Sequence, residues 1–81
     1  MELKYIVTDD DEFCIFSTSQ CHAVVAQALR GKPVGAGTCI IAPEANSPRA
    51  SVRCYGRSDA LDVSSREADG QIINRQINDW M

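Results

Sequence analysis

Basic and aromatic side chains alternate with apolar ones along residues 49–57. In a β-strand successive side chains point to opposite faces of the sheet, so Val52 and Cys54 would share one face. The opposite face would carry the candidate binding residues Arg49, Arg53, Tyr55 and Arg57. Guanidinium groups bind carboxylates or phosphates in a bidentate way, and a tyrosine can stack on a base or anchor a protein interface. The pattern predicts a recognition surface; the structural alternative is a solvated face whose arginines pair with the acids at residues 9–11.

Four consecutive acidic residues occupy positions 9–12. Carboxylate oxygens suit hard divalent cations, and an acidic run can also imitate the phosphates of a nucleic acid. The run lacks the Asp-x-Asp-x-Asp-Gly spacing and the distal glutamate of an EF-hand loop. We therefore expect a solvated hairpin turn here and no bound metal.

Cys21 is followed directly by His22, the single histidine of the chain. The first turn of a helix can lower the pKa of a thiol, which is the basis for thiol-dependent catalysis. Neighbouring helical residues point in different directions, so we expect Cys21 on a buried apolar stripe and His22 on the polar face. The cysteines form no CxxC pair, which favours reduced core residues over a disulfide framework or a zinc site.

Glycines at positions 31, 35 and 37 give this segment a superficial likeness to a phosphate-binding loop. No GxxxxGK[ST] pattern is present, and these glycines lead into a predicted strand, whereas a dinucleotide-binding loop leaves a strand and opens a helix. We expect them to allow close helix-to-sheet packing or a bulge, and we expect no cofactor.

The strands that would position these residues are indicated by runs of β-branched and aromatic residues. Residues 3–8 and 13–16 predict one hairpin around the acidic turn, and residues 34–42 and 50–57 predict a second hairpin. A loop at residues 43–48 with two prolines joins the second pair. Residues 61–63 are either a short strand or the lead into a final helix.

Two helices are expected between and after the hairpins. The first has candidate caps at residues 17–19 and ends near Arg30, before a glycine at the C′ position. Ser64 and Glu67 have the spacing of a capping box for the second, which would run almost to Met81. Gly70 costs that helix about 1 kcal/mol relative to alanine, or marks a close contact with the sheet. The apolar positions are Cys21, Val24, Val25, Ala28 and Leu29 in the first helix, and Ile72, Ile73, Ile77 and Trp80 in the second.

The predicted order β-β-α-β-β-(β)-α indicates a single α+β domain over residues 1–81. Two β-hairpins would form an antiparallel or mixed sheet, with both helices packed on one of its faces. The second face would be open to water or to a partner.

Length and charge narrow the function classes. A chain of 81 residues has no room for an enclosed site for a large cofactor, so any site should lie on the surface. The net charge of −3 argues against general electrostatic binding to nucleic acid or anionic membranes. The start of the chain does not read as a signal peptide and no segment has the length of a membrane helix, so we expect a cytoplasmic protein without a membrane partner.

Our leading hypothesis is a small non-enzymatic module that binds another protein or itself, as a homodimer, through the arginine and tyrosine face. The alternative is a phage or mobile-element type of regulator that binds nucleic acid or inhibits a nucleic-acid enzyme. A second alternative is a small thiol-dependent enzyme that uses Cys21 and His22.

Overall fold

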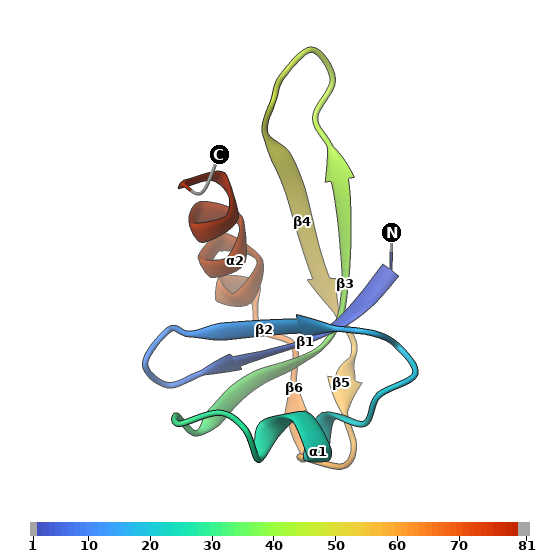
Figure 1. Cartoon of the computed structure of the whole chain (residues 1–81), viewed down its shortest axis with the longest axis vertical. Helices are drawn as coiled ribbons and strands as arrows, with labels where there is room; N and C mark the ends of the chain where they lie inside the picture. The colour runs from blue at the N-terminus through green and yellow to red at the C-terminus, as the bar shows by residue number, and fades with distance from the viewer. Residues whose placement is uncertain (1, 80–81) are drawn as a thin grey trace.

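The computed structural model describes residues 2–79 and confirms the α+β class (Figure 1). A four-stranded antiparallel sheet, a two-stranded sheet and two helices make up this part of the chain. Neither of the helices described there has the length and apolar character needed to cross a membrane. The elements follow in the order β1 (Glu2–Thr8), β2 (Phe13–Phe16), α1 (His22–Ala26), β3 (Pro33–Pro43), β4 (Ala50–Tyr55), β5 (Arg57–Ser58), β6 (Val63–Ser64) and α2 (Glu67–Asp79).

Strand β3 links the two predicted hairpins into one sheet of order β2-β1-β3-β4. Its whole length is extended, and it runs from the β1–β2 pair to the upright β3–β4 hairpin (Figure 1). Strand β4 ends at Tyr55, earlier than predicted, because Gly56 takes a φ of +80°. That left-handed conformation favours glycine and breaks the strand. The chain after Gly56 therefore forms the separate β5–β6 ladder.

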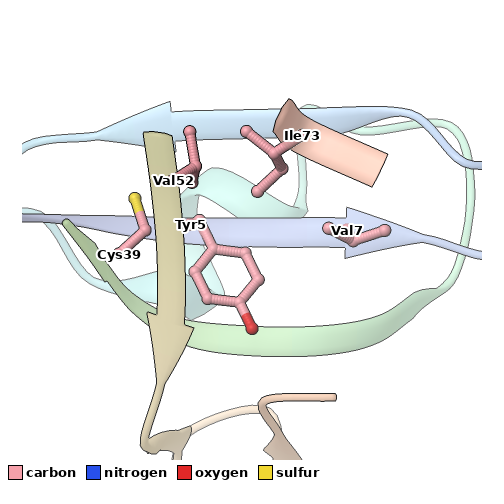
Figure 2. Packing of buried hydrophobic residues seen from close by; sticks show 5 residues of the cluster. All are labelled: Tyr5, Val7, Cys39, Val52 and Ile73. Carbon is pink, nitrogen blue, oxygen red and sulfur yellow. The ribbon is translucent and has the colours of Figure 1, made fainter. Parts of the chain in front are cut away.

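One face of the sheet packs against α2 around a cluster of buried side chains (Figure 2). Tyr5 and Val7 come from β1, Cys39 from β3, Val52 from β4 and Ile73 from α2. Tyr5, Val7, Cys39 and Ile73 are completely buried. The predicted apolar side of α2 is confirmed at Ile73, whereas Trp80 lies outside the described residues.

The opposite face packs against α1 and the β5–β6 segment. Ile6, Phe16 and Ala36 form its buried cluster, with Val25 and Val63 packed against them. The prediction that both helices cover one face is therefore wrong. Strand β1 has an apolar run, residues 5–7, in which all three side chains are completely buried. Since alternate side chains point to opposite faces, such a strand needs cover on both sides.

Helix α1 is a single turn, much shorter than the predicted segment up to Arg30. Its N-cap residue, Cys21, makes no side-chain capping bond, and Val24 is 65% exposed. Tight turns follow, in which the amides of Ala28 and Leu29 bond to carbonyls three residues back. The β-branched residues in this segment lose side-chain entropy in a helix. The packing of a single turn is too small to offset that loss, so the helix does not continue.

Helix α2 begins at Glu67, and its first turn is closed by a bond that was not predicted. The backbone N–H of Arg66 donates to Asp69 Oδ2 at 2.9 Å. In a capping box, a side chain in the first turn accepts from the backbone N–H of the N-cap residue. Arg66 and Asp69 make this bond, two residues after Ser64 and Glu67, for which the box was predicted. Gly70 faces β4: a β-carbon there would lie 3.4 Å from the Val52 carbonyl oxygen. Gly70 thus lies against the sheet, at a distance that still leaves room for an alanine.

Candidate binding surface

Part of the α1-side face is left open near the β3–β4 hairpin. Within the sheet register Glu2 of β1 lies opposite Ile40 of β3, which lies opposite Arg53 of β4. Tyr55 is two residues beyond Arg53 and so shares this face. Ile40 is 37% exposed and Tyr55 is 44% exposed, although both are large apolar side chains. We call these four residues the open patch.

The open patch holds its tyrosine in place and leaves its arginine unpaired. Tyr55 donates a hydrogen bond from its hydroxyl to Glu2 Oε2 at 2.5 Å. This bond to a carboxylate raises the pKa of Tyr55, because it stabilises the protonated phenol. Among residues 2–79, no carboxylate lies within ion-pair distance of Arg53. The patch therefore presents a fixed aromatic ring, an aliphatic side chain and an available guanidinium.

Only two of the four predicted binding residues meet in this patch. Arg53 and Tyr55 share it, but Arg57 is turned aside after Gly56 and bonds to Asp59 at 2.9 Å and to Asp62 at 2.8 Å. The alternative pairing of arginines with residues 9–11 is wrong, since among the described residues the acids that pair with arginine are Asp59, Asp62 and Asp69.

Arg49 lies before the start of β4, in the connection between β3 and β4. Its N–H donates to Ser47 Oγ at 3.1 Å, and its carbonyl oxygen accepts from the amide of Glu44 at 3.0 Å. At about 3.3 Å of rise per residue, it stands roughly 13 Å along the chain from Arg53. Arg49 therefore flanks the open patch at the far end of the hairpin.

Glu2 and Ile40 belong to the open patch but were missed from the sequence. Ile40 could have been predicted from the sequence, because pairing the two strands of the second hairpin across their loop places it opposite Arg53. Glu2 reaches the patch only because β1 pairs with β3, which is a matter of strand order. No local pattern in the sequence encodes that order.

The acidic run forms the predicted turn between β1 and β2. Thr8 donates from its hydroxyl to Asp10, and Asp11 has a φ of +62°. The hydrogen bond from Thr8 lowers the pKa of the Asp10 carboxyl. Asp9 Oδ1 accepts from the amide of Lys32 at 3.1 Å, which ties the turn to the start of β3. Within the described residues, no three His, Cys, Asp or Glu side chains are grouped as metal ligands.

Cys21 and His22 are arranged in the opposite way to the prediction. Cys21 is exposed, while His22 is buried and its ring meets that of Phe16 edge to face at 5.3 Å. His22 Nε2 donates to the carbonyl oxygen of Gly37 at 3.0 Å, since a carbonyl can only accept. Helix α1 is too short to form the predicted apolar stripe, and the ring contact with Phe16 stabilises His22 in a buried position. The imidazole thus has a structural role between α1 and β3.

A buried polar network joins α2 to the sheet on the other face. Tyr5 donates the one hydrogen of its hydroxyl to Asp69 Oδ2 at 2.7 Å, and its oxygen accepts from Ser65 Oγ at 2.9 Å. Arg66 Nε donates to Asp69 Oδ1 at 2.9 Å, and Arg66 Nη2 forms an ion pair with the same oxygen at 2.8 Å. Burial is the largest cause of the raised pKa of Tyr5, so this phenol stays protonated. Every charge and donor here has a partner in the fold, which marks the network as structural.

Gly35 makes room for that network. A β-carbon at this position would overlap the carboxylate of Asp69, so α2 and β3 approach each other only where β3 has no side chain. The glycines predicted to permit close helix-to-sheet packing therefore do so at Gly35.

Within residues 2–79, the open patch brings two exposed apolar side chains and an unpaired guanidinium together on one face, whereas the acidic turn, His22 and Asp69 are engaged within the fold. Comparison of the chain with protein-family models, with curated proteins and with solved structures finds no match to any of them.

Proposed function

We propose that this protein is a non-enzymatic binding module that holds another protein through the open patch. The observation that carries the proposal is the exposure of Ile40 and Tyr55 beside the unpaired guanidinium of Arg53. Aromatic and arginine side chains dominate the binding energy of protein interfaces, and apolar side chains at the centre of a patch lose water on contact.

The chemistry of the patch defines the partner. Arg53 needs a carboxylate, and Ile40 with the ring of Tyr55 needs an apolar side chain next to it. Arg49, which also has no ion pair among the described residues, would strengthen the preference for an acidic protein surface. We infer a cytoplasmic setting because the four cysteines form no CxxC pair and have no spacing that indicates a disulfide framework.

The test begins with affinity capture from the native host and continues with the purified partner. We expect the double variant Arg53→Ala/Tyr55→Ala to bind that partner at least about tenfold more weakly than the wild type. The matched control is Arg75→Ala/Val24→Ala, which removes one exposed arginine of α2 and one exposed apolar side chain of α1, neither of them part of the patch. The control should bind as the wild type does, and circular dichroism should show both variants folded.

Four results would overturn the proposal. Equal binding by the patch variant and the wild type would remove the patch from the interface. Equal weakening by the control would show that the effect is not local. Recovery of nucleic acid, with an affinity that falls steeply as salt rises, would assign the arginines to phosphates instead. Light scattering of the purified chain identifies self-association, which would replace the foreign partner with a second copy.

A further inference from the structure

Two cysteines face each other across the β3–β4 hairpin. Cys39 of β3 and Cys54 of β4 are direct partners in the antiparallel register. Both side chains belong to the α2-side core, where Cys39 is completely buried and Cys54 is partly exposed. Figure 2 shows Cys39 beside β4 in this core. Strand alternation directs the side chains of the open patch to the opposite face, although Arg53 also borders the groove that Cys54 lines.

The hydrogen bonds of Ala50 show whether Cys39 and Cys54 form a hydrogen-bonded or a non-hydrogen-bonded pair of the antiparallel ladder. Ala50 donates its N–H to Asn78 Oδ1 at 3.0 Å, and its carbonyl accepts from Asn78 Nδ2 at 3.2 Å. Both backbone groups of Ala50 thus point away from β3 and toward α2. Backbone direction alternates along a regular strand, so Cys54, four residues on, also points its backbone groups away from β3.

Cys39 and Cys54 therefore form a non-hydrogen-bonded pair. In such pairs the two Cα atoms are about 4.5 Å apart and the side chains are at their closest. Disulfides need Cα atoms about 4.4–6.8 Å apart. The strand pairing thus brings the two backbones within the range of a disulfide before any reaction takes place.

A reagent can reach this pair from one side. Cys54 lines a groove between β4 and α2, together with Gly70, Gln71 and Asn74. Cys39 lies behind it, without exposure. The accessible thiol and the protected thiol have the arrangement of an attacking and a resolving cysteine.

We propose that Cys39 and Cys54 are a redox modification site that forms an intramolecular disulfide by exchange with a small disulfide such as oxidised glutathione. Cys54 gives up its proton, and its sulfur bonds to one glutathione sulfur while the other leaves as a thiolate. Cys39 then loses its proton, attacks Cys54 Sγ and releases the second glutathione. Two protein thiols are oxidised by two electrons, and one glutathione disulfide is reduced to two thiols.

The disulfide would close a loop of about 15 residues around the β3–β4 connection. Closing a loop of that length lowers the conformational entropy of the unfolded chain and so stabilises the folded state. In a domain of this size we expect Tm to rise by an amount on the order of 10 °C. The same two strands carry Ile40 and Arg53 on their other face, so oxidation would stiffen the part of the sheet that bears the open patch.

The test uses the full chain, reduced and then incubated with oxidised glutathione for hours at about pH 8.5, because burial raises the pKa of the Cys54 thiol to about 12 and keeps the reactive thiolate scarce. We expect an intact mass lower by about 2 Da, a crosslinked peptide joining Cys39 to Cys54, and the rise in Tm. The variant Cys14→Ser/Cys21→Ser should react in the same way, because it keeps the facing pair. Cys39→Ser should instead retain one glutathione on Cys54, since the resolving thiol is gone.

Several outcomes would refute the modification site. One is an unchanged mass in native buffer with crosslinking only in urea, because the fold would then not favour the reaction. Another is a disulfide that involves Cys14 or Cys21, or that joins two chains. A third is a Cys39→Ser variant that carries no glutathione on Cys54, which would show that the groove does not admit the reagent.

Discussion

Asp69 is the residue whose replacement tests the packing of α2 most directly. It is completely buried and accepts three hydrogen bonds, one from the hydroxyl of Tyr5 and two from the backbone N–H and Nε of Arg66, and it also forms an ion pair with Arg66 Nη2. The change Asp69→Asn keeps the volume but places an NH₂ group where an oxygen now accepts from two donors. The variant must therefore leave donors without an acceptor.

The magnitude follows from those bonds. Hydrogen bonds to a charged group contribute about 1.5–3 kcal/mol each, and the amide disturbs at least two of them. The side chain of Arg66 is 40% exposed and can turn toward water, and Tyr5 keeps its bond to Ser65, so we take the lower end. We expect Asp69→Asn to lower the free energy of unfolding by about 3 kcal/mol. Domains of about 80 residues have only roughly 4–12 kcal/mol in total.

Equilibrium urea unfolding at neutral pH measures this loss as a lower midpoint at unchanged slope. The matched control is Asp79→Asn, an exposed carboxylate on the same helix, which should stay within about 0.5 kcal/mol of the wild type. A double-mutant cycle with Tyr5→Phe isolates the bond between the two side chains, with an expected coupling of about 1 kcal/mol. A loss below about 1 kcal/mol, with no coupling, would refute the assignment of Asp69 as the anchor of α2.

Three further predictions concern positions on the α2 side of the sheet. Burial raises the pKa of Cys39 to about 11 and that of Cys54 to about 12. Both thiols therefore lose their protons on unfolding above pH 9. The free energy of unfolding should fall as pH rises toward 12, by up to about 1.4 kcal/mol per pH unit for each thiol. Urea midpoints across this range should fall less steeply in Cys39→Ala/Cys54→Ala. Gly70→Ala should raise the free energy of unfolding by about 0.5–1 kcal/mol in thermal melts, because its β-carbon would make only an ordinary contact with β4; a loss would contradict that spacing. Gly35→Ala should cost more than about 3 kcal/mol, since its β-carbon would overlap the carboxylate of Asp69, and wild-type stability would show that α2 does not pack as described.

The local elements were largely predictable. Residues 3–8 and 13–16 were expected as a hairpin around the acidic turn, and the structure has β1 and β2 within one residue of those bounds. The second hairpin and the last helix were also expected. In each case the signal lies within one short segment: a run of β-branched residues, a group of turn residues, or apolar residues at helical spacing.

Errors arose where a local pattern competed with packing. The stripe from Cys21 to Leu29 has helical spacing, yet α1 stops after one turn and buries His22 instead. The alternation along residues 49–57 is regular, yet Gly56 redirects Arg57 to Asp59. A single aromatic contact or one positive φ outweighs a periodicity that contributes only tenths of a kcal/mol per residue.

The sequence alone determined that this is a small α+β chain of two hairpins and two helical segments, and it identified Arg53 and Tyr55 as neighbours on one face. Only the tertiary structure decided that the helices lie on opposite faces, that Glu2 and Ile40 complete the open patch, and that Cys39 faces Cys54. The physical reason is that strand order and register are set by pairing between distant segments. Such pairing depends on how all the apolar faces can be buried together, and no single segment carries that information.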